Sequence, residues 1–546
     1  MTKSRDLGNL VSDGASSGVA VYATISAMTD VASPSAGDLA YVTANTSLYQ
    51  NNGNGWYKIA TVNTSPAIDS VSETTSGSTT TLSNNGAFTL TAGANTVVTI
   101  TASDTDPGTD LTYSHYVTGT ASNVATITQG TGASENVFTF VPATSVGGTI
   151  TVRFDVTDNT NTAQFTNSFT LSFEMTGTQQ ARLISSDAAA WDNQGWEVDI
   201  DGDTAVVGTR NKEAVYVYVR SGTSWSQQAK LTASDGASGD QFGIDVGVSG
   251  DYIVVGAKQD DDAGTNSGSA YVFVRSGTTW TQQQKLTASN AATHDGFGAS
   301  VDIDGSSILV GAPFEDTGGT NFGTAYVFTR SGTTWSQQQE IAPTGTSGDF
   351  YGYFCAIEGD NAVVGAYGHN PTDKGRAFVW TRSGTTWTQQ AALNASDAAN
   401  YDRFGHGVSI SGDTIVCGAY QEDTTASDAG AVYIFTRSGT TWSQQQKIQS
   451  SDISASDNFG FSVAVDGDTL IAGARYQDTG SSGAGAAYIF TRSGTTWTQA
   501  HKIQASTTSM NGYFGSSVAL SDKTGIIGEY LLEHNSVNSG GAYIFV

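Results

Sequence analysis

Short runs of alternating apolar and polar residues recur along almost the whole chain. They are rich in Val, Ile, Thr, Tyr and Phe and end at Gly, Asp or Ser, as in residues 97–102 and 150–156. A period of two residues is typical of half-buried β-strands. Because no sustained apolar pattern at i, i+3 and i+4 accompanies these runs, the sequence predicts an all-β protein.

An internal repeat occupies the C-terminal two thirds of the chain. Its first signature is an aromatic residue followed by Gly, and the later copies follow one another at intervals of 53 to 55 residues. An apolar residue followed by Gly and usually Ala comes next, and an aromatic strand follows, so that all three signatures count seven copies. The first signature stands at Phe242-Gly243, Phe297-Gly298, Tyr351-Gly352, Phe404-Gly405, Phe459-Gly460 and Phe514-Gly515, and in the first copy the order is reversed, as Gly195-Trp196.

Each copy divides into four short strands joined by tight turns. In the sixth copy they cover residues 459–465, 469–474, 486–491 and 497–503. A four-stranded antiparallel sheet repeated seven times is typical of a β-propeller. The sequence therefore predicts a seven-bladed propeller over residues 176–546.

The two ends of the repeat predict how this propeller closes. The seventh copy stops at Val546 after its third strand, whereas residues 178–183 match the fourth strand at 282–286 but precede the first copy. We therefore expect residues 178–183 to supply the outer strand of the last blade and to cover its open edge.

The N-terminal third predicts two further β domains. Residues 66–175 have the length and strand spacing of an Ig- or cadherin-like β-sandwich. Residues 1–65 contain short strands around an Asn/Gly-rich turn and predict a small β module that anchors the chain.

Asp-rich turns in the predicted sandwich resemble cadherin-type calcium linkers. The residues concerned are Asp104, Asp106 and Asp158. Since Ca²⁺ takes carboxylate oxygens, calcium in this domain is one hypothesis. The alternative is plain turn chemistry, in which Asp and Gly cap a hairpin. No other metal or cofactor is predicted.

The repeat resembles the FG-GAP repeat, the family that also builds the propeller of integrin α chains. Both halves of the name can be read in the sixth copy, as Phe459-Gly460 and Gly473-Ala474, and the resemblance covers residues 178–546. In calcium-binding members of the family an Asp-rich loop joins the first two strands. Here that connection is a turn such as Asp466-Gly-Asp468, too short to surround an ion with about six to eight oxygens. The resemblance therefore does not extend to metal binding.

The charge balance narrows the classes of partner. Of the 546 residues, 51 are acidic and 23 are basic, which gives a formal net charge of −28. Repulsion from phosphates makes nucleic acid an unfavourable partner. No run reaches the roughly 20 apolar residues of a membrane helix, and no apolar segment of signal-peptide type follows Lys3 and Arg5. We expect neither membrane insertion nor export by a signal peptide.

The loops on one face of the predicted propeller vary between copies, while those on the other face hardly change. The variable loops join strands two and three and connect successive copies. Variation over a uniform scaffold is typical of a recognition surface, although neutral drift in exposed loops would give the same pattern. Carboxylate and aromatic side chains of these loops suit hydroxyl hydrogen bonds and sugar stacking. The candidate binding residues are Asp260, Asp261, Asp262, Glu315, Asp316, Tyr367, Tyr420, Glu422, Asp423 and Asp478.

No catalytic constellation emerges from the sequence, and we predict that the protein is not an enzyme. The six His residues occupy different registers of the repeat and form no ring of metal ligands. Cys355 and Cys417 fall at core positions of strands and predict buried apolar side chains.

The N-terminal module indicates where the protein works. Residues 40–42 through 55–59 resemble small modules at the start of phage tail-fibre and other virion structural proteins, particularly of marine phages. The resemblance implies a virion protein, a tail fibre or a capsid-attached fibre or decoration, assembled in the host cytoplasm in several copies or as a homo-oligomer. Residues 1–65 would contact other virion proteins, and the propeller would bind a host-surface receptor or glycan. The alternatives are a bacterial surface adhesin and a polysaccharide-degrading propeller enzyme.

Overall fold

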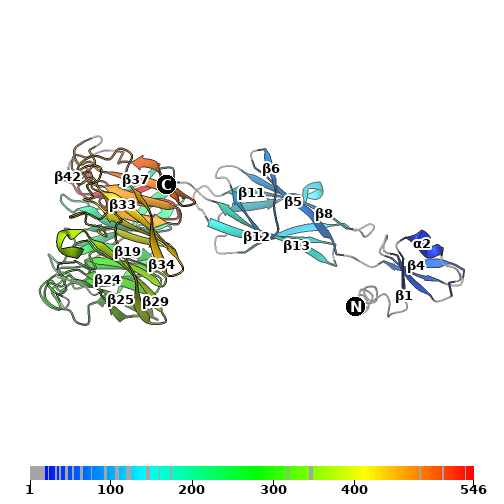
Figure 1. Cartoon of the computed structure of the whole chain (residues 1–546), viewed down its shortest axis with the longest axis horizontal. Coiled ribbons are helices and arrows are strands. Elements are labelled where there is room, and N and C mark those ends of the chain that lie inside the picture. The colour runs from blue at the N-terminus through cyan, green and yellow to red at the C-terminus, as the bar shows by residue number, and fades with distance from the viewer. Residues whose placement is uncertain are drawn as a thin grey trace. The chain divides into compact units, whose positions relative to one another are not determined.

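The computed structural model divides the chain into two units, Met1–Phe173 and Glu174–Val546 (Figure 1). Each unit is described by itself. The described residues are 19–22, 24–30, 34–35, 38–42, 47–51, 54–61, 65–75, 77–90, 95–104, 110–118, 125–142, 148–158, 160–171, 175–316, 319–343, 348–478, 481–506, 509–534 and 537–546.

The first unit begins with a small four-stranded sheet and one short helix. Its strands are β1 (Val19–Tyr22), β2 (Leu39–Val42), β3 (Ser47–Asn51) and β4 (Trp56–Thr61), in that order across the sheet, and α2 spans Ile25–Thr29. Strands β1 and β2 are parallel, and the other pairs are antiparallel. Met28 of the helix packs with Ala40, Val42 and Tyr49, so the helix covers the apolar side of a sheet that is too small to bury a core alone.

Two further sheets of the first unit share one hydrophobic core. One sheet has the order β10-β11-β8-β5-β6 and the other β7-β13-β12-β9. Phe140 of the first sheet and Phe169 of the second have ring centroids 4.5 Å apart, so the alternating apolar residues of both sheets meet. The strands are β5 (Ala67–Thr75), β6 (Ser78–Thr81), β7 (Gly86–Leu90), β8 (Thr96–Ser103), β9 (Thr112–Thr118), β10 (Ala125–Gln129), β11 (Val137–Pro142), β12 (Gly148–Thr157) and β13 (Thr162–Leu171).

The second unit contains seven four-stranded antiparallel sheets, the blades of a propeller. The first strands are β15 (Gln194–Asp201), β19 (Phe242–Ser249), β23 (Ser300–Asp304), β27 (Cys355–Glu358), β31 (Val408–Ser411), β35 (Phe459–Asp466) and β39 (Val518–Ser521). Each first strand contacts the next one, and β39 contacts β15, so they form a closed inner ring around an axis.

The second strands of the blades are almost completely buried, and most third strands are buried over their first five residues and more exposed toward their ends. The second strands are β16 (Thr204–Thr209), β20 (Tyr252–Ala257), β24 (Ser307–Ala312), β28 (Asn361–Ala366), β32 (Thr414–Ala419), β36 (Thr469–Ala474) and β40 (Thr524–Glu529). The third strands are β17 (Ala214–Ser221), β21 (Ser269–Ser276), β25 (Thr324–Ser331), β29 (Arg376–Ser383), β33 (Ala431–Ser438), β37 (Ala486–Ser493) and β43 (Gly541–Phe545). A hairpin of β41 (Glu533–His534) and β42 (Val537–Asn538) precedes the last of these.

The outer strands form the rim of the propeller. They are β18 (Ser224–Leu231), β22 (Thr279–Leu286), β26 (Thr334–Ile341), β30 (Thr386–Leu393), β34 (Thr441–Ile448), β38 (Thr496–Ile503) and β14 (Gln179–Leu183). Strand β14, from the start of the unit, pairs antiparallel with β43 at its end. The last blade is therefore completed by the N-terminal segment of the propeller, and no blade is left with three strands.

Side chains at the rim and near the axis connect neighbouring blades. At the rim, the indole N–H of Trp335 donates to Gln283 of the preceding blade at 3.0 Å, and that of Trp225 donates to Gln180 of β14 at 2.8 Å. Near the axis, the side chain before each turn between the first two strands accepts a backbone N–H from the turn of the next blade. The acceptors, in chain order, are Asp201, Ser249, Asp304, Glu358, Ser411, Asp466 and Ser521, and Ser521 closes the ring on Gly202.

The glycines of the two repeat signatures also meet at the blade boundaries. A Cβ built on Gly311, in the second strand of its blade, would lie 1.9 Å from the carbonyl oxygen of Gly352 in the next blade. Gly352 belongs to the aromatic-Gly pair and has φ +88°, a conformation that L side chains rarely adopt. Backbone therefore packs on backbone here, which explains why both positions are Gly.

The prediction of an all-β chain with seven four-stranded repeats is confirmed. Among the described residues, no helix has the length and apolar character needed to cross a membrane.

Candidate functional site

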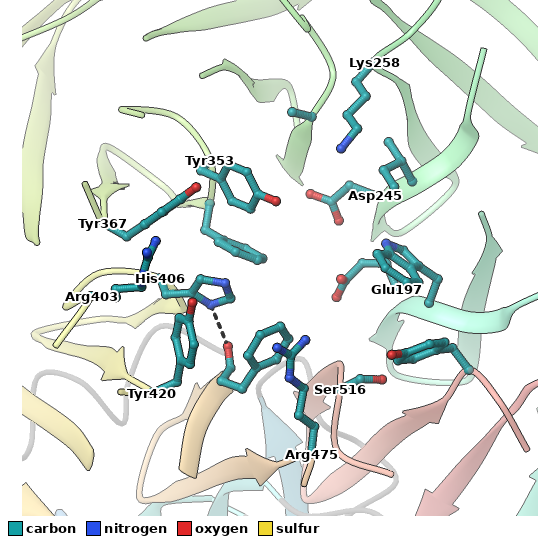
Figure 2. Close-up of a pocket in the computed structure, with 16 residues that line it drawn as sticks. Glu197, Asp245, Lys258, Tyr353, Tyr367, Arg403, His406, Tyr420, Arg475 and Ser516 are labelled. Carbon is teal, nitrogen blue, oxygen red and sulfur yellow. Dashed lines mark hydrogen bonds between the residues drawn. The ribbon is translucent and has the colours of Figure 1, made fainter. Parts of the chain in front are cut away.

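A pocket of about 290 Å³ lies where the seven blades converge at one end of the propeller (Figure 2). One side chain from every blade lines it, and each of these follows the Gly of the first repeat signature. These seven residues are Trp196, Ile244, Ala299, Tyr353, His406, Phe461 and Ser516. Residues directly after the second signature add a further layer, namely Lys258, Tyr367, Tyr420, Arg475 and Tyr530.

The backbone of the repeat explains this convergence. The Gly of the aromatic-Gly pair has a positive φ, and the aromatic residue before it packs into its own blade, as Phe404 does against Tyr433 and Phe435. The residue after Gly then lies at the start of the inner strand and faces the axis. Positions that differ in every blade are thus held by a backbone that is nearly the same in all of them.

Aromatic rings form one side of the pocket, here called the aromatic wall: Tyr353, Tyr367, His406, Tyr420 and Phe461 (Figure 2). The His406 ring lies at the centre, with its centroid 4.5 Å from the centroids of both Tyr420 and Phe461. Tyr353 and Tyr367 meet edge to face at 5.0 Å. The wall therefore presents ring faces and Tyr hydroxyls to the same cavity.

His406 is a neutral member of this wall. Burial, together with the positive charges of Arg475 and Arg403, lowers the pKa of its imidazole to about 3. Its Nδ1 lies 3.1 Å from the carbonyl oxygen of Phe461, so the neutral ring donates the Nδ1 proton to that oxygen. A ring held in this way supports the aromatic wall and does not gain a proton at ordinary pH.

Four cationic side chains surround the pocket and are called the basic cluster: Arg210, Lys258, Arg403 and Arg475. The guanidinium of Arg475 lies over the Phe461 ring at 3.6 Å, and that of Arg210 lies over Trp196 at 4.4 Å. Burial lowers the pKa of Lys258, and the charge of Arg210 adds to this effect. The cations are thus close enough to one another to interact unfavourably.

Two carboxyl groups, Glu197 and Asp245, lie across the pocket from the aromatic wall (Figure 2). Burial raises the pKa of Asp245 to about 7. Burial and the neighbouring Asp245 hold the pKa of Glu197 well above its usual range. Both oxygens of Asp245 accept backbone N–H groups, from Val246 at 2.9 Å and Val301 at 2.8 Å, so this side chain also joins two blades.

Of the candidate residues predicted from sequence, the structure brings only Tyr367 and Tyr420 into this pocket. Four acidic residues instead stabilise their own loops, and each accepts the backbone N–H of the residue five positions further on at 2.7 Å. These are Asp261, Asp316, Asp423 and Asp478.

The other four predicted acidic residues also make bonds within single blades. Asp260 accepts from the Tyr271 hydroxyl at 2.7 Å and pairs with Lys285 at 2.9 Å; Asp262 pairs with the same Lys285. Elsewhere, Glu422 pairs with Lys447 at 2.9 Å, and Glu315 accepts from Thr324 at 3.0 Å. The structure therefore does not gather the predicted acidic residues into one site.

Sequence reasoning missed most of the pocket, including Trp196, Tyr353, His406, Arg403 and Arg475. A signal was present, since the positions after the two Gly signatures differ from blade to blade although their flanks are uniform. The predicted candidates came from the variable loops, whereas the informative variation lies at the ends of the strands that those loops connect.

The proposed calcium residues lie in the first unit. Asp158 accepts the backbone N–H groups of Thr160 at 2.7 Å and Asn161 at 2.6 Å, which is the turn chemistry given as the alternative. Asp104 follows the end of β8, and Asp106 lies outside the described residues. Within the described parts of the chain, no group of three or more His, Cys, Asp or Glu side chains is placed to hold a metal ion.

Seven blades around an axial pocket define the second unit as a β-propeller. A scan against protein families matches the FG-GAP repeat over more than half of the chain, and the chain belongs to the FG-GAP repeat family. Each matched segment begins at the outer strand of one blade and ends in the third strand of the next, so β14 opens the first segment. The matched residues are 178–222, 225–273, 280–328, 335–380, 387–435, 442–490 and 497–545.

Three solved structures match this chain at low similarity. A proposed 6-phosphogluconolactonase from Bacteroides fragilis is 13% identical with a TM-score of 0.39, over 71% of this chain and 97% of that one. A quinonprotein alcohol dehydrogenase-like protein from Bacteroides thetaiotaomicron is 10% identical with a TM-score of 0.33, over 77% and 94%. A proposed 6-phosphogluconolactonase from Bacteroides uniformis is 11% identical with a TM-score of 0.41, over 65% and 92%. Values this low say nothing about the activity of this chain. A search of curated proteins found no match.

Proposed function

We propose that this chain is a non-enzymatic attachment protein of a phage particle, a tail fibre or a capsid-attached fibre or decoration, whose propeller binds a saccharide on the host surface. The observation that carries the proposal is the axial pocket, where side chains from all seven blades converge and bring aromatic faces, Tyr hydroxyls and charged donors together. Its volume of about 290 Å³ lies at the small end of the range of ligand sites and suits one or two sugar rings.

The framework of the pocket favours binding by a preformed site. The blades are joined by hydrogen bonds near the axis and at the rim, so the side chains that line the pocket are fixed before a ligand arrives. A preformed site loses little conformational entropy when it binds. Weak single contacts to a sugar can therefore still give useful affinity, which many copies on one particle would raise further.

The particle assignment rests on the N-terminal unit. Its first residues resemble virion modules, and its two small β assemblies suit an anchor and an Ig- or cadherin-like spacer. Other virion proteins would be the partners of residues 1–65, and the protein would occur in several copies. A bacterial surface adhesin would use the same pocket in a different location.

A second candidate function, cleavage of a polysaccharide, is favoured by one observation. Glu197 and Asp245 are two carboxyl groups in one pocket, as glycoside hydrolysis requires, and a raised pKa suits the general acid of such a pair. However, both oxygens of Asp245 already accept backbone N–H groups. This engagement favours a structural role, so we rank the enzyme below the binding protein.

Two matched Trp substitutions test saccharide binding. Trp196 lines the pocket, whereas Trp191, in the same blade, is 60% exposed and lies outside it. On a glycan array, the full chain should bind defined saccharides, Trp196→Ala should abolish the signal and Trp191→Ala should retain it. An array without signal, or equal loss in both variants, would contradict the proposal.

A second experiment tests the particle assignment and the absence of enzymatic activity. Antibody against residues 1–65 should label purified phage particles, and absence of the protein from them would leave the adhesin as the better hypothesis. Incubation with the array-positive polysaccharide should release no reducing ends. Release that is lost in Glu197→Gln would establish the enzyme instead.

A further inference from the structure

The basic cluster is unusual because, among the described residues, three of its four members lack the carboxylate partners that most other cations of the propeller have. In five blades the Arg at the end of the third strand pairs with an Asp of the neighbouring turn at 2.6 to 2.8 Å. In four blades a Lys of the outer strand pairs with an Asp at 2.5 to 2.9 Å. The repeat therefore neutralises most of its own cations.

Much less neutralisation is found at the pocket. Among the described residues, Arg210, Lys258 and Arg475 have no carboxylate within ion-pair distance, and Arg403 has only Asp373, at 3.5 Å. The Nε atoms of Arg403 and Arg475 are buried without a hydrogen-bond partner in the described structure. Burying uncompensated donors and cations costs free energy, so a ligand that supplies acceptors would recover part of that cost.

The carboxyl groups of the pocket do not cancel this charge. Burial raises the pKa of Asp245 to about 7, so near neutral pH its protonated form is populated, and burial together with Asp245 holds the pKa of Glu197 well above its usual range. A protonated carboxyl is a hydrogen-bond donor and does not repel an anion. The pocket therefore offers a surplus of positive charge in a chain whose net charge is −28.

The opposite end of the channel has the reverse character. It is lined by acidic residues of the turns between the first two strands, including Asp201, Asp304 and Asp466. These carboxylates are engaged in the ring of hydrogen bonds between blades. Among the residues that line the two ends of the axis, the cations lie only at the end with the aromatic wall, so an anion would enter from that face.

From this arrangement we infer that the axial pocket binds an anionic sugar residue, with its carboxylate or sulfate group held by Arg475 and Arg403 and its ring against the aromatic wall. The inference rests on the proposed function and names the class of saccharide. Arg475 is suited to the role because stacking on Phe461 at 3.6 Å fixes the plane of its guanidinium and leaves the edge free to donate. Guanidinium groups bind planar oxyanions through two parallel hydrogen bonds, which adds both affinity and orientation.

The test compares acidic sugars with neutral counterparts and with a free anion. The full chain is titrated by calorimetry, and checked by saturation-transfer NMR, with glucuronic, galacturonic and N-acetylneuraminic acids, with glucose 6-sulfate, with glucose and galactose, and with sodium sulfate. At least one acidic sugar should bind about 10-fold or more tightly than its neutral counterpart, the contribution expected of one charge-assisted contact. Arg475→Gln should remove about the same factor.

Arg437→Gln is the matched control. It removes the same charge from the same unit, but Arg437 pairs with Asp413 at 2.7 Å at a turn away from the pocket. It should leave the affinity unchanged. If Arg475→Gln melts below the wild type, Arg403→Gln replaces it, and its expected effect is a similar loss.

The outcomes separate this inference from the proposed function. If neutral and acidic sugars bound with equal affinity while Trp196→Ala abolished the binding of both, the inference would be overturned. The saccharide-binding function would remain intact. If sodium sulfate competed as well as the best acidic sugar, the pocket would be a simple anion site. That outcome would also overturn the inference. Equal losses in Arg475→Gln and Arg437→Gln would show long-range electrostatics rather than a contact, and the inference would again be wrong.

Discussion

The contact between Gly311 and Gly352 allows a sharp test of how the blades determine the pocket. In Gly311→Ala, the new Cβ would lie 1.9 Å from the Gly352 carbonyl oxygen and 2.8 Å from its carbon. Real Cβ atoms do not come closer than 3.0 Å, and the obstructing atoms belong to the backbone. The two blades must therefore move apart by about an ångström at this point.

The expected cost follows from what that movement disrupts. Gly352 N donates to Gly365 O at 3.0 Å, and Gly311 O accepts from Gly298 N at 3.0 Å, so hydrogen bonds on both sides of the contact are strained. Overpacking costs about 1–3 kcal/mol, and one weakened buried hydrogen bond adds about 1 kcal/mol. The free energy of unfolding of the propeller should fall by about 2–4 kcal/mol. Tyr353 of the aromatic wall follows Gly352 directly, so saccharide affinity should fall as well.

Urea unfolding followed by Trp fluorescence measures this effect. Every Trp except Trp56 belongs to the propeller unit, so the signal reports on that unit. Gly305→Ala is the control, because its Cβ would meet nothing within 4 Å and the only penalty comes from φ +55°. That penalty is about 1–2 kcal/mol. If Gly311→Ala unfolded at the same urea concentration as Gly305→Ala, close packing of the blades would not be the reason for Gly at this position.

Two pH-dependent predictions concern the carboxyl groups along the axis. Burial raises the pKa of Asp302 to about 6. Between about pH 4 and 6 the folded state therefore binds more protons than the unfolded state. The free energy of unfolding falls as the pH rises through this window. Asp302→Ser, which copies Ser409 at the same position of another blade, should flatten that slope in urea titrations. The affinity for an acidic sugar should also fall as the pH rises. Asp245 loses its proton with a pKa of about 7, and the resulting carboxylate repels an anion. An acidic sugar should bind more weakly at pH 8 than at pH 6, measured by calorimetry.

Each of these predictions has an internal control. Ser409 Oγ accepts the N–H of Val465 at 3.2 Å, and Asp302 accepts that of Ile357 at 2.7 Å, so the Ser variant keeps an acceptor at the blade boundary. An unchanged slope in Asp302→Ser would assign the pH effect to other groups. For binding, a neutral sugar serves as the reference. A loss of affinity at pH 8 that is equal for the neutral and the acidic sugar would contradict a charge effect of Asp245.

The candidate site was predicted from sequence only where its residues lie next to recognisable loops. Tyr367 and Tyr420 were found because each stands at the end of a second strand, beside a variable loop. The acidic loop residues were chosen for their charge, yet Asp260 lies buried between the Tyr271 hydroxyl and Lys285. Although burial alone would raise it, these bonds hold the pKa of Asp260 below its usual value, as expected of a structural ion pair. Charge along the sequence does not distinguish an exposed carboxylate from one that a neighbouring strand has already neutralised.

Periodicity and turn chemistry within about 50 residues are enough to predict the repeat, its seven copies, the four strands of each copy and the outer strand at residues 178–183. Which positions meet depends on how the blades close into a ring. His406 and Tyr353 are 53 residues apart in sequence, and Trp196 and Arg475 are 279 apart, yet closure of the ring brings all four to one cavity. A single blade has no pocket, because its axial side chains form a site only when all seven blades surround the same axis.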